Sequence, residues 1–365
     1  MEEMISAQNA EVVQSVEEGA ISVQTSEIVE SVDGAQGAVA KKRKRRNRQE
    51  RLDNFWGWAF CAPLLFGTIA FVYIALIITV VLSFTSYNGS TPLFEYLFGG
   101  NMSAMNGDPF YWYKYVFTNE NLFRWVYCGL FNAVFYMIGI PIGMVLSMFF
   151  AVCMTRDIKG ANVYRIIYYL PSVASTIAIV YTFNRLFYST DAGVINQLIG
   201  KTIKWLNPEA GLAWSPSAIT SKWVVIIMAT WKGLGGTIIL YIAGLSGINA
   251  SHKEAASIDG ANGWITFWRI VFPQLWPTIF YNIVTADIGG MQIYMEPDLL
   301  FGGGNTGSYL QQTSGYVGLI VGYSHLGRMS ADPLIGLSSV LGIFLAIIIM
   351  IMTLFQFYLD RKNNA

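Results

Sequence analysis

The chain has few charged residues for its length. Only 13% of its 365 residues are charged, whereas 54% are hydrophobic, and the mean hydropathy is +0.44. A soluble globular domain carries about a quarter charged residues. The shortage of charge excludes an ordinary soluble domain, and we expect an all-α protein that crosses a membrane several times.

Cysteine and histidine are also scarce. The cysteines, Cys61, Cys128 and Cys153, show no paired spacing and lie in or beside apolar stretches, which favours packing over disulfide or metal chemistry. The histidines, His252 and His325, are far apart in the chain, and the topology predicted below places them on opposite sides of the membrane. Paired-histidine metal sites and catalytic triads are thereby excluded within one chain, so we expect no catalytic residue and no metal site.

Nucleotide-binding motifs are missing. Residues 302–307 have the spacing GxGxxG, but they follow a predicted membrane helix instead of a strand, so dinucleotide binding is not expected. Gly200, Lys201 and Thr202 resemble the end of a phosphate-binding loop, but Ile195 stands where that motif needs a glycine. We therefore expect the chain to have no ATP site of its own and to bind no cofactor.

Long apolar stretches are what the chain has instead. About 20 mostly apolar residues cross a bilayer as a helix. We predict six transmembrane spans, at residues 56–83, 129–154, 163–187, 222–246, 274–294 and 334–358. The first and last contain unbroken apolar runs, whereas polar residues or proline interrupt the third and the fifth.

Basic residues beside the spans predict the orientation. Residues 41–51 are rich in Lys and Arg, and because cytoplasmic flanks are enriched in these residues, the N-terminus should be cytoplasmic. Six crossings return the C-terminus to the same side, where Arg361 and Lys362 lie. The loops 155–162 and 249–269, with Arg156, Lys159 and Lys253, would also be cytoplasmic, and the segments 84–128, 188–221 and 295–333 external.

Residues 1–52 differ from the helical domain predicted at 53–365. Residues 1–40 contain acidic side chains but no Lys, Arg or aromatic residue, so they cannot bury a core and are predicted to be a disordered tail. The basic run at 41–51 is better explained as an orientation signal and a contact with membrane lipid than as a nucleic-acid patch. We expect no cleavable secretory signal, because the acidic start has no early apolar region.

The most informative cytoplasmic segment is the loop at 249–273. Ser251 and Glu254 have capping-box spacing, which predicts a helix that begins near His252. Gly260 suits the left-handed residue that commonly ends a helix. Apolar residues at roughly helical spacing then lead to Pro273. The loop could dock on a partner, or it could be a capped connector that packs under its own bundle.

This loop resembles the EAA signature of permease subunits of binding-protein-dependent ABC importers. Glu254-Ala255-Ala256, Gly260 and Ile270-x-x-Pro273 stand at its spacing, with Phe272 where leucine is usual. Further segments resemble the carbohydrate-uptake branch, specifically its maltose-type first permeases: 169–172, 193–196, 231–235, 241–245 and 258–261. The resemblance covers about residues 55–360 and implies a type I ABC importer fold.

The resemblance implies a division of labour among subunits. An extracellular binding protein would deliver a sugar, this chain would pair with a second homologous permease in the bacterial plasma membrane, and two ATPase subunits would hold ATP and Mg²⁺. The loop would be a coupling helix that docks on an ATPase, whose closure drives alternating access. The residues implied in coupling are Glu254, Ala255, Ala256, Asp259, Gly260, Arg269 and Pro273.

Polar residues in the fifth span are candidates for the sugar pathway, because polar groups within a membrane usually face a cavity or the bundle interior. Asp287 and Met291 share a helix face, with Tyr294 beside them. The candidates are Asn282, Asp287, Met291, Gln292, Tyr294 and, more weakly, Trp231. A structural contact with the partner permease or a neighbouring helix is the alternative role.

Other basic residues lie outside this set. Lys232 and Arg185 are near the ends of predicted spans, where their ammonium or guanidinium groups would reach the interface. With no Lys or Arg deep in a predicted span, a neutral sugar is favoured over a phosphorylated one. The alternative function is an ion-coupled secondary transporter of a small polar solute, but neither an internal repeat nor a series of membrane carboxylates is evident.

Overall fold

A computed structural model describes residues 53–100, 102–155, 161–208, 212–301, 312–324 and 334–364. Every regular element in these ranges is helical, as predicted. The predicted acidic tail and basic run, together with Arg156, Lys159, His325 and residues 302–307, lie outside the described residues. The chain divides into two units, Met1–Ile77 and Ile78–Ala365, and each is described by itself.

The described part of the first unit is a single apolar helix. The helix begins at Asp53 and continues to Leu82 in the second unit. It contains a π-helical turn, η1 (Ile69–Tyr73), followed by α2 (Ile74–Leu82). Because one helix cannot bury its apolar side chains against itself, these side chains need lipid or a second helix around them.

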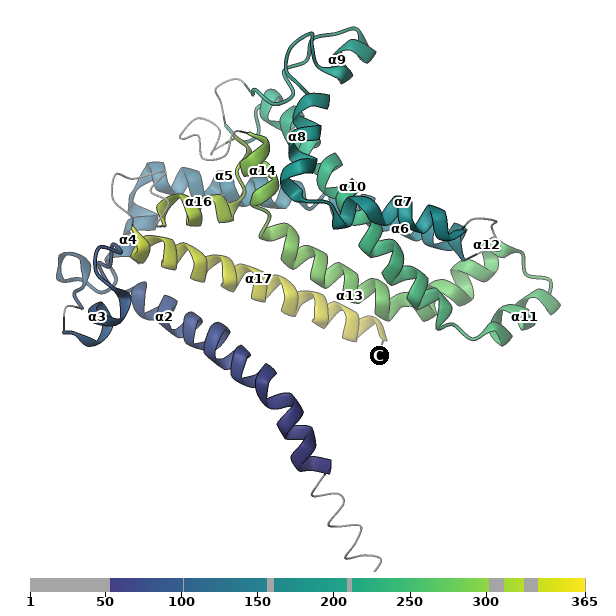
Figure 1. The fold of residues 1–365 in the computed structure, drawn as a ribbon, viewed down its shortest axis with the longest axis horizontal. Coiled ribbons are helices and arrows are strands. Elements are labelled where there is room, and N and C mark those ends of the chain that lie inside the picture. The colour runs from purple at the N-terminus through teal and green to yellow at the C-terminus, as the bar shows by residue number, and fades with distance from the viewer. Residues whose placement is uncertain are drawn as a thin grey trace, which may run out of the picture. The chain divides into compact units, whose positions relative to one another are not determined.

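The second unit contains helices of very unequal length (Figure 1). In chain order after α2 they are α3 (Leu93–Phe98), η2 (Met105–Gly107), α4 (Tyr111–Thr118), α5 (Glu120–Tyr136), α6 (Gly139–Met154), α7 (Ala161–Val173), α8 (Thr176–Leu186), α9 (Val194–Ile199), α10 (Pro216–Ser246), α11 (Ala250–Ile258), α12 (Gly263–Thr266), η3 (Phe267–Val271), α13 (Phe272–Met291), α14 (Met295–Leu300), α16 (Tyr316–Tyr323) and α17 (Ile335–Asn364).

Four helical segments in the described residues are long and apolar enough to cross a membrane: Asp53–Leu82, Glu120–Met154, Pro216–Ser246 and Ile335–Lys362. They confirm that the first, second, fourth and sixth predicted spans are helices. The second and fourth begin earlier than predicted, because polar capping residues lower the hydropathy of their first turns. Asn119 accepts a hydrogen bond from the N–H of Leu122 at 3.0 Å, and Ser215 accepts one from the N–H of Ala218 at 3.4 Å.

The third and fifth predicted spans differ from a simple crossing helix. The third consists of α7 and α8, which are bent by 95° at the break between them. Pro171 lies inside α7 two residues before its end, where the missing N–H weakens the helix. The fifth corresponds to α13, whose 20 residues include Asn282 and Asp287 and are less apolar than the four segments above. Six crossings therefore stay a prediction.

α10 is the central helix of the second unit and packs against α6, α7 and α13 (Figure 1). Its contact with α7 depends on Gly235. A Cβ added there would lie 2.5 Å from the carbonyl oxygen of Tyr168 and 2.9 Å from the Cα of Tyr169. The two helix backbones thus touch at this point, and they form adjoining walls of the cavity described below.

The segment between α8 and α10 is organised by one buried asparagine. The Asn196 amide donates to the carbonyls of Tyr188, Thr190 and Ile203, at 3.2, 3.0 and 3.1 Å. Its oxygen accepts from the N–H of Ile203 at 3.1 Å and from the indole of Trp205 at 2.8 Å. With two N–H hydrogens shared among three carbonyl groups and an oxygen that accepts twice, this one side chain holds the segment together around the short helix α9.

Candidate functional site

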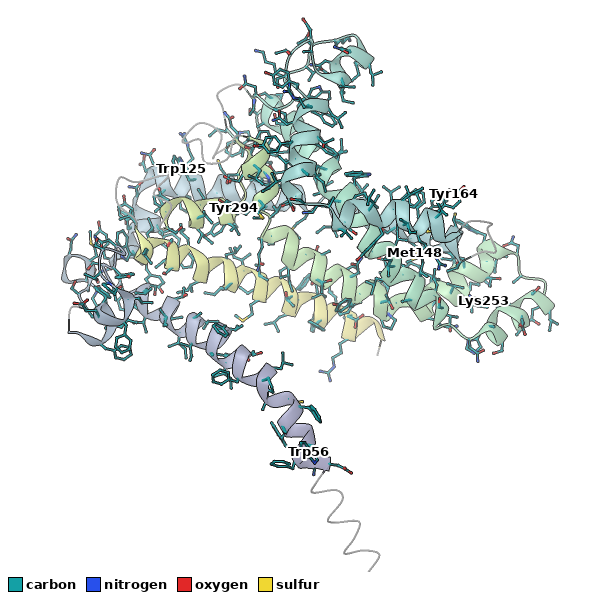
Figure 2. All side chains as sticks on the ribbon, viewed as in Figure 1. Trp56, Trp125, Met148, Tyr164, Lys253 and Tyr294 are labelled. Atoms are coloured by element: carbon teal, nitrogen blue, oxygen red, sulfur yellow. The ribbon has the colours of Figure 1, made fainter. Side chains whose placement is uncertain are left out.

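The loop at 249–273 begins with α11, a short helix at the end of the second unit opposite α5. Figure 2 labels Lys253 on α11 and Trp125 on α5. Asn249 is the N-cap, because its side-chain oxygen accepts a hydrogen bond from the N–H of Ser251 at 3.1 Å. The predicted capping box of Ser251 and Glu254 is therefore wrong, since the helix starts before Ser251. Glu254 is exposed and has no hydrogen bond or ion pair with any described residue.

The end of α11 agrees with the prediction. Gly260 has a φ of +75°, in the left-handed region. Its N–H donates to the carbonyl of Ser257 at 3.1 Å, and the N–H of Ala261 donates to the carbonyl of Ala256 at 2.9 Å. This pair of hydrogen bonds is the Schellman arrangement. Ala256 is buried, whereas the exposed surface of the helix includes Glu254, Ala255 and Asp259.

Replacing Gly260 with alanine is expected to destabilise the end of α11 by about 1 kcal/mol, because a side chain at positive φ crowds the following carbonyl. No atom lies within 4 Å of the added Cβ, so the effect comes from the backbone alone. Gly260→Asn is the matched control, since asparagine tolerates this conformation better. Hydrogen exchange of the Ala261 amide, measured by mass spectrometry, should be faster in the alanine variant; equal rates in both variants would contradict the prediction.

The second half of the loop continues into α13 without a break. The Asn262 side chain caps α12 by accepting from the N–H of Ile265 at 2.9 Å, and the helix then passes through η3 into α13. Pro273 comes just after the π-helical turn η3, inside this continuous helix, to which it donates no backbone N–H. The helix therefore begins before residue 274, the predicted start of the fifth span, and the span itself stays a prediction. Pro273 and Arg269 are both exposed.

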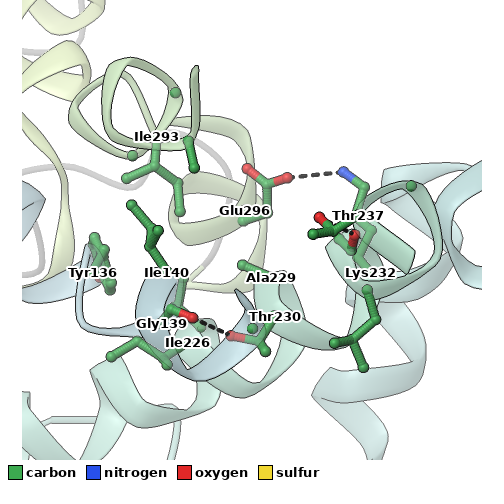
Figure 3. Close-up of a pocket in the computed structure, with 18 of the residues that line it drawn as sticks. Tyr136, Gly139, Ile140, Ile226, Ala229, Thr230, Lys232, Thr237, Ile293 and Glu296 are labelled. Carbon is green, nitrogen blue, oxygen red and sulfur yellow. Dashed lines mark hydrogen bonds and ion pairs between the residues drawn. The ribbon is translucent and has the colours of Figure 1, made fainter. Parts of the chain in front are cut away.

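A cavity of about 810 Å³ lies beside α10, and Figure 3 shows residues that line it. Its walls come mainly from α6, α10, α13 and the start of α14, and α5, α7, α8 and α16 contribute one residue each: Tyr136, Ser172, Thr176 and Val317. The volume lies within the range of about 300–1,000 Å³ that is usual for small-molecule sites. Apolar walls alternate with hydroxyl and amide side chains, namely Ser147, Ser172, Thr176, Thr230, Thr237, Asn282 and Gln292.

Two charged side chains meet in this cavity, Lys232 from α10 and Glu296 from α14 (Figure 3). The Lys232 Nζ lies 2.9 Å from the Glu296 Oε1 and donates a second hydrogen bond to the Thr176 Oγ1 at 2.7 Å. Glu296 lies in the first turn of α14, where the helix dipole favours an acidic side chain. The pair therefore links three helices at one wall of the cavity.

The predicted place of Lys232 near the end of a span is wrong, and so is the inference that no Lys lies deep in one. Lys232 is in the middle of α10, which begins at Pro216. The sequence held a signal for that start, because Ser215 followed by Pro216 is a typical N-cap and first helical residue. Glu296 was missed because it belongs to a segment assigned to the exterior.

The predicted pathway residues fall in different places. Asn282, Gln292 and Tyr294 line the cavity, and the Asn282 amide donates to the Tyr241 hydroxyl at 3.0 Å. The other three candidates do not line it, and their pathway roles stay predictions. Asp287 lines a separate apolar groove between α6, η3 and α13, and it accepts a hydrogen bond from Gln356. Met291 is buried in the core, and Trp231 packs on Phe183.

Comparisons with known proteins give a consistent result. The family model described as binding-protein-dependent transport system inner membrane component matches residues 116–364. The probable ABC transporter permease protein YesP of Bacillus subtilis is 31% identical over 71% of this chain and 76% of its own length. The lactose transport system permease protein LacF of Rhizobium radiobacter is 27% identical over 69% of this chain and 78% of its own length.

One solved structure resembles the fold closely. A chain in the crystal structure of a bacterial alginate ABC transporter, in complex with an alginate pentasaccharide-bound periplasmic protein, has a TM-score of 0.63 and 20% sequence identity. The match covers 86% of this chain and 96% of that chain. The bent pair α7–α8, the long α10 and the short helix α11 all lie within the matched family region.

Proposed function

Since the chain belongs to the family of binding-protein-dependent transport system inner membrane components, we propose that it is the permease subunit of an ATP-driven sugar importer in the bacterial plasma membrane. It has the type I ABC importer fold of that family, and it is a multi-pass membrane protein. ATP hydrolysis would take place in separate subunits, and this chain would move the sugar by alternating access.

The observation that supports this proposal most strongly is the α11 loop. The helix is capped at both ends, Ala256 is its buried residue, and its exposed surface includes Glu254, Ala255 and Asp259, with no hydrogen bond or ion pair from Glu254 to any described residue. A capped helix with such an exposed surface suits docking on an ATPase subunit. The residues proposed for coupling are Glu254, Ala255, Ala256, Asp259, Gly260, Arg269 and Pro273, of which Ala256 is buried and the other six are exposed.

The proposed topology has six crossings with both termini in the cytoplasm. The four long apolar segments supply four crossings, the bent pair α7–α8 a fifth, and α13 the sixth. α13 is acceptable as a crossing because its polar residues can face a cavity or a neighbouring helix instead of lipid. Asn282 and Asp287 each have a hydrogen-bond partner on another helix, which supports this assignment.

The cavity beside α10 is the proposed place of the sugar during transport. Its hydroxyl and amide groups can bind sugar hydroxyls, and its apolar walls can contact the carbon faces of the ring. The relative LacF is named for lactose transport, and the alginate transporter was solved with a sugar-loaded periplasmic protein. We therefore place an extracellular sugar-binding protein, a second homologous permease and two ATPase subunits among the partners of this chain.

Affinity purification of the tagged full-length chain from membranes tests the proposal. We expect a second permease and an ATPase to co-purify, and reconstituted vesicles with the binding protein should take up sugar only when ATP is supplied. A proton-gradient uncoupler should leave uptake unchanged at constant ATP. Uptake that continues without ATP and stops with the uncoupler would contradict the proposal and indicate a secondary transporter.

A further inference from the structure

The charges in the cavity cancel. Among the described residues that line it, Lys232 and Glu296 are the only charged side chains, one of each sign. Their side chains are 24% and 18% exposed, so the pair faces the cavity and is not sealed in the core. The net charge presented to a bound molecule is therefore zero, which favours neither a cation nor an anion.

The pair also keeps spare hydrogen-bonding capacity. The Lys232 ammonium has three N–H groups, and it uses two of them, on Glu296 Oε1 and Thr176 Oγ1. The Glu296 carboxylate uses Oε1, and Oε2 has no partner among the described residues. One charged donor and one charged acceptor therefore remain side by side at the cavity wall, close enough to act on neighbouring groups of one ligand.

Adjacent hydroxyl groups of a neutral sugar match this arrangement. A hydroxyl both donates and accepts, so one can accept from Lys232 while its neighbour donates to Glu296 Oε2. The carboxylate of an acidic sugar can only accept, and it would be brought close to the Glu296 carboxylate. Since like charges in a desolvated site repel each other, an acidic sugar would bind there poorly.

We infer that Lys232 and Glu296 form a specificity-determining pair that binds two adjacent hydroxyl groups of an uncharged sugar and disfavours acidic sugars. This inference rests on the proposed function, because it takes the cavity as the sugar site of an importer. The preference for a neutral sugar no longer rests on a lack of Lys in the spans, because Lys232 lies in the middle of α10. It rests instead on the pairing of Lys232 with Glu296, which brings the net charge of the cavity to zero.

Saturation-transfer NMR on the purified complete importer in nanodiscs tests this inference, since it detects weak sugar binding without the binding protein. The probes are matched neutral and acidic sugars: glucose and glucuronate, galactose and galacturonate, mannose and mannuronate. In the unmodified complex we expect the neutral member to bind at least about fivefold more tightly. Glu296→Gln, which frees the Lys232 charge, should shift the ratio toward the acidic member by about tenfold or more.

Three further variants make the experiment decisive. Lys232→Met should weaken binding of the neutral sugars, and the exchanged pair Lys232→Glu/Glu296→Lys should restore the preference for them. Asp108→Asn is the matched control, because it removes a carboxylate from the exposed Asp108–Lys114 ion pair, whose Oδ2 and Nζ lie 2.6 Å apart, and should leave the ratio unchanged. Melting temperatures of all complexes are measured in parallel.

Several outcomes would overturn the inference. Equal or tighter binding of acidic sugars to the unmodified complex would do so, as would an unchanged ratio in Glu296→Gln. If the Lys232 and Glu296 variants have a lower melting temperature and bind neutral and acidic sugars less tightly to the same extent, the pair only stabilises the packing of the helices. If no sugar binds while uptake still depends on ATP, this inference fails and the proposed function stands; if uptake does not depend on ATP, the proposed function fails.

Discussion

Replacing Glu254 with glutamine is expected to lower ATP-driven sugar uptake at least tenfold while leaving the folded chain intact. The Glu254 carboxylate is exposed and has no partner among the described residues, so its loss removes no contact with that part of the chain. In the proposed complex it meets a basic group of the ATPase, and truncating one partner of a buried charge pair costs about 2–5 kcal/mol. Uptake and sugar-stimulated ATP hydrolysis in reconstituted vesicles would measure the effect.

Asn249→Ala is the matched control for this experiment. It removes the N-cap of α11 and should cost about 1 kcal/mol of helix stability, but it leaves the Glu254 carboxylate in place. We expect a smaller loss of uptake and no change in the ATP hydrolysed per sugar. If Glu254→Gln shows normal uptake and normal coupling, the docking role of α11 is wrong; if the two variants behave alike, helix stability and not the carboxylate is what matters.

Replacing Gly235 with alanine is expected to lower the melting temperature of the chain by several degrees. The added Cβ would lie 2.5 Å from a carbonyl oxygen and 2.9 Å from a Cα of α7, and backbone atoms cannot rotate away as a side chain can. Overpacking of this kind costs about 1–3 kcal/mol. Uptake should fall as well, because Lys232 lies one turn before Gly235 on the wall of the cavity.

The neighbouring residue is the matched control. Nothing lies within 4 Å of a Cβ added at Gly236, which is in the same helix. Gly236→Ala should therefore keep or raise the melting temperature, since alanine is favoured over glycine in a helix by up to about 1 kcal/mol. Thermal unfolding of the purified variants, followed by tryptophan fluorescence, compares the two; equal melting temperatures would show that α7 moves aside without cost.

The elements that sequence analysis predicted well are those governed by composition and local spacing. A run of about 20 apolar residues needs a helix to satisfy its backbone in lipid, and that requirement holds whatever the neighbouring residues are. The first and last spans are examples. Gly260 is another, because the left-handed turn depends only on the residues around it. The comparisons confirm the family resemblance. It could be recognised in the sequence because its motifs are short and local.

The errors concern positions that depend on more than local hydropathy. The start of α10 was placed late because the residues around it are polar. Lys232 lies well inside even the predicted span 222–246, so treating it as a residue near a membrane interface was wrong independently of that shift. At the start of α11, Asn249 and Ser251 are both residues that can cap a helix, and the chain uses Asn249. In α13, polar residues with similar hydropathy contact different surfaces, since Asn282 lines the cavity and Asp287 the apolar groove.

By itself the sequence determined that this protein is a helical membrane protein, that it belongs with the importer permeases, and that the loop at 249–273 carries a capped helix. Each of these follows from residues within one helix or one loop. Only the tertiary structure decided that Lys232 and Glu296 meet. The two residues are 64 positions apart in the chain, on helices whose relative position depends on packing, including the close contact at Gly235. No local pattern encodes that distance, so the charge balance of the cavity could be known only from the folded chain.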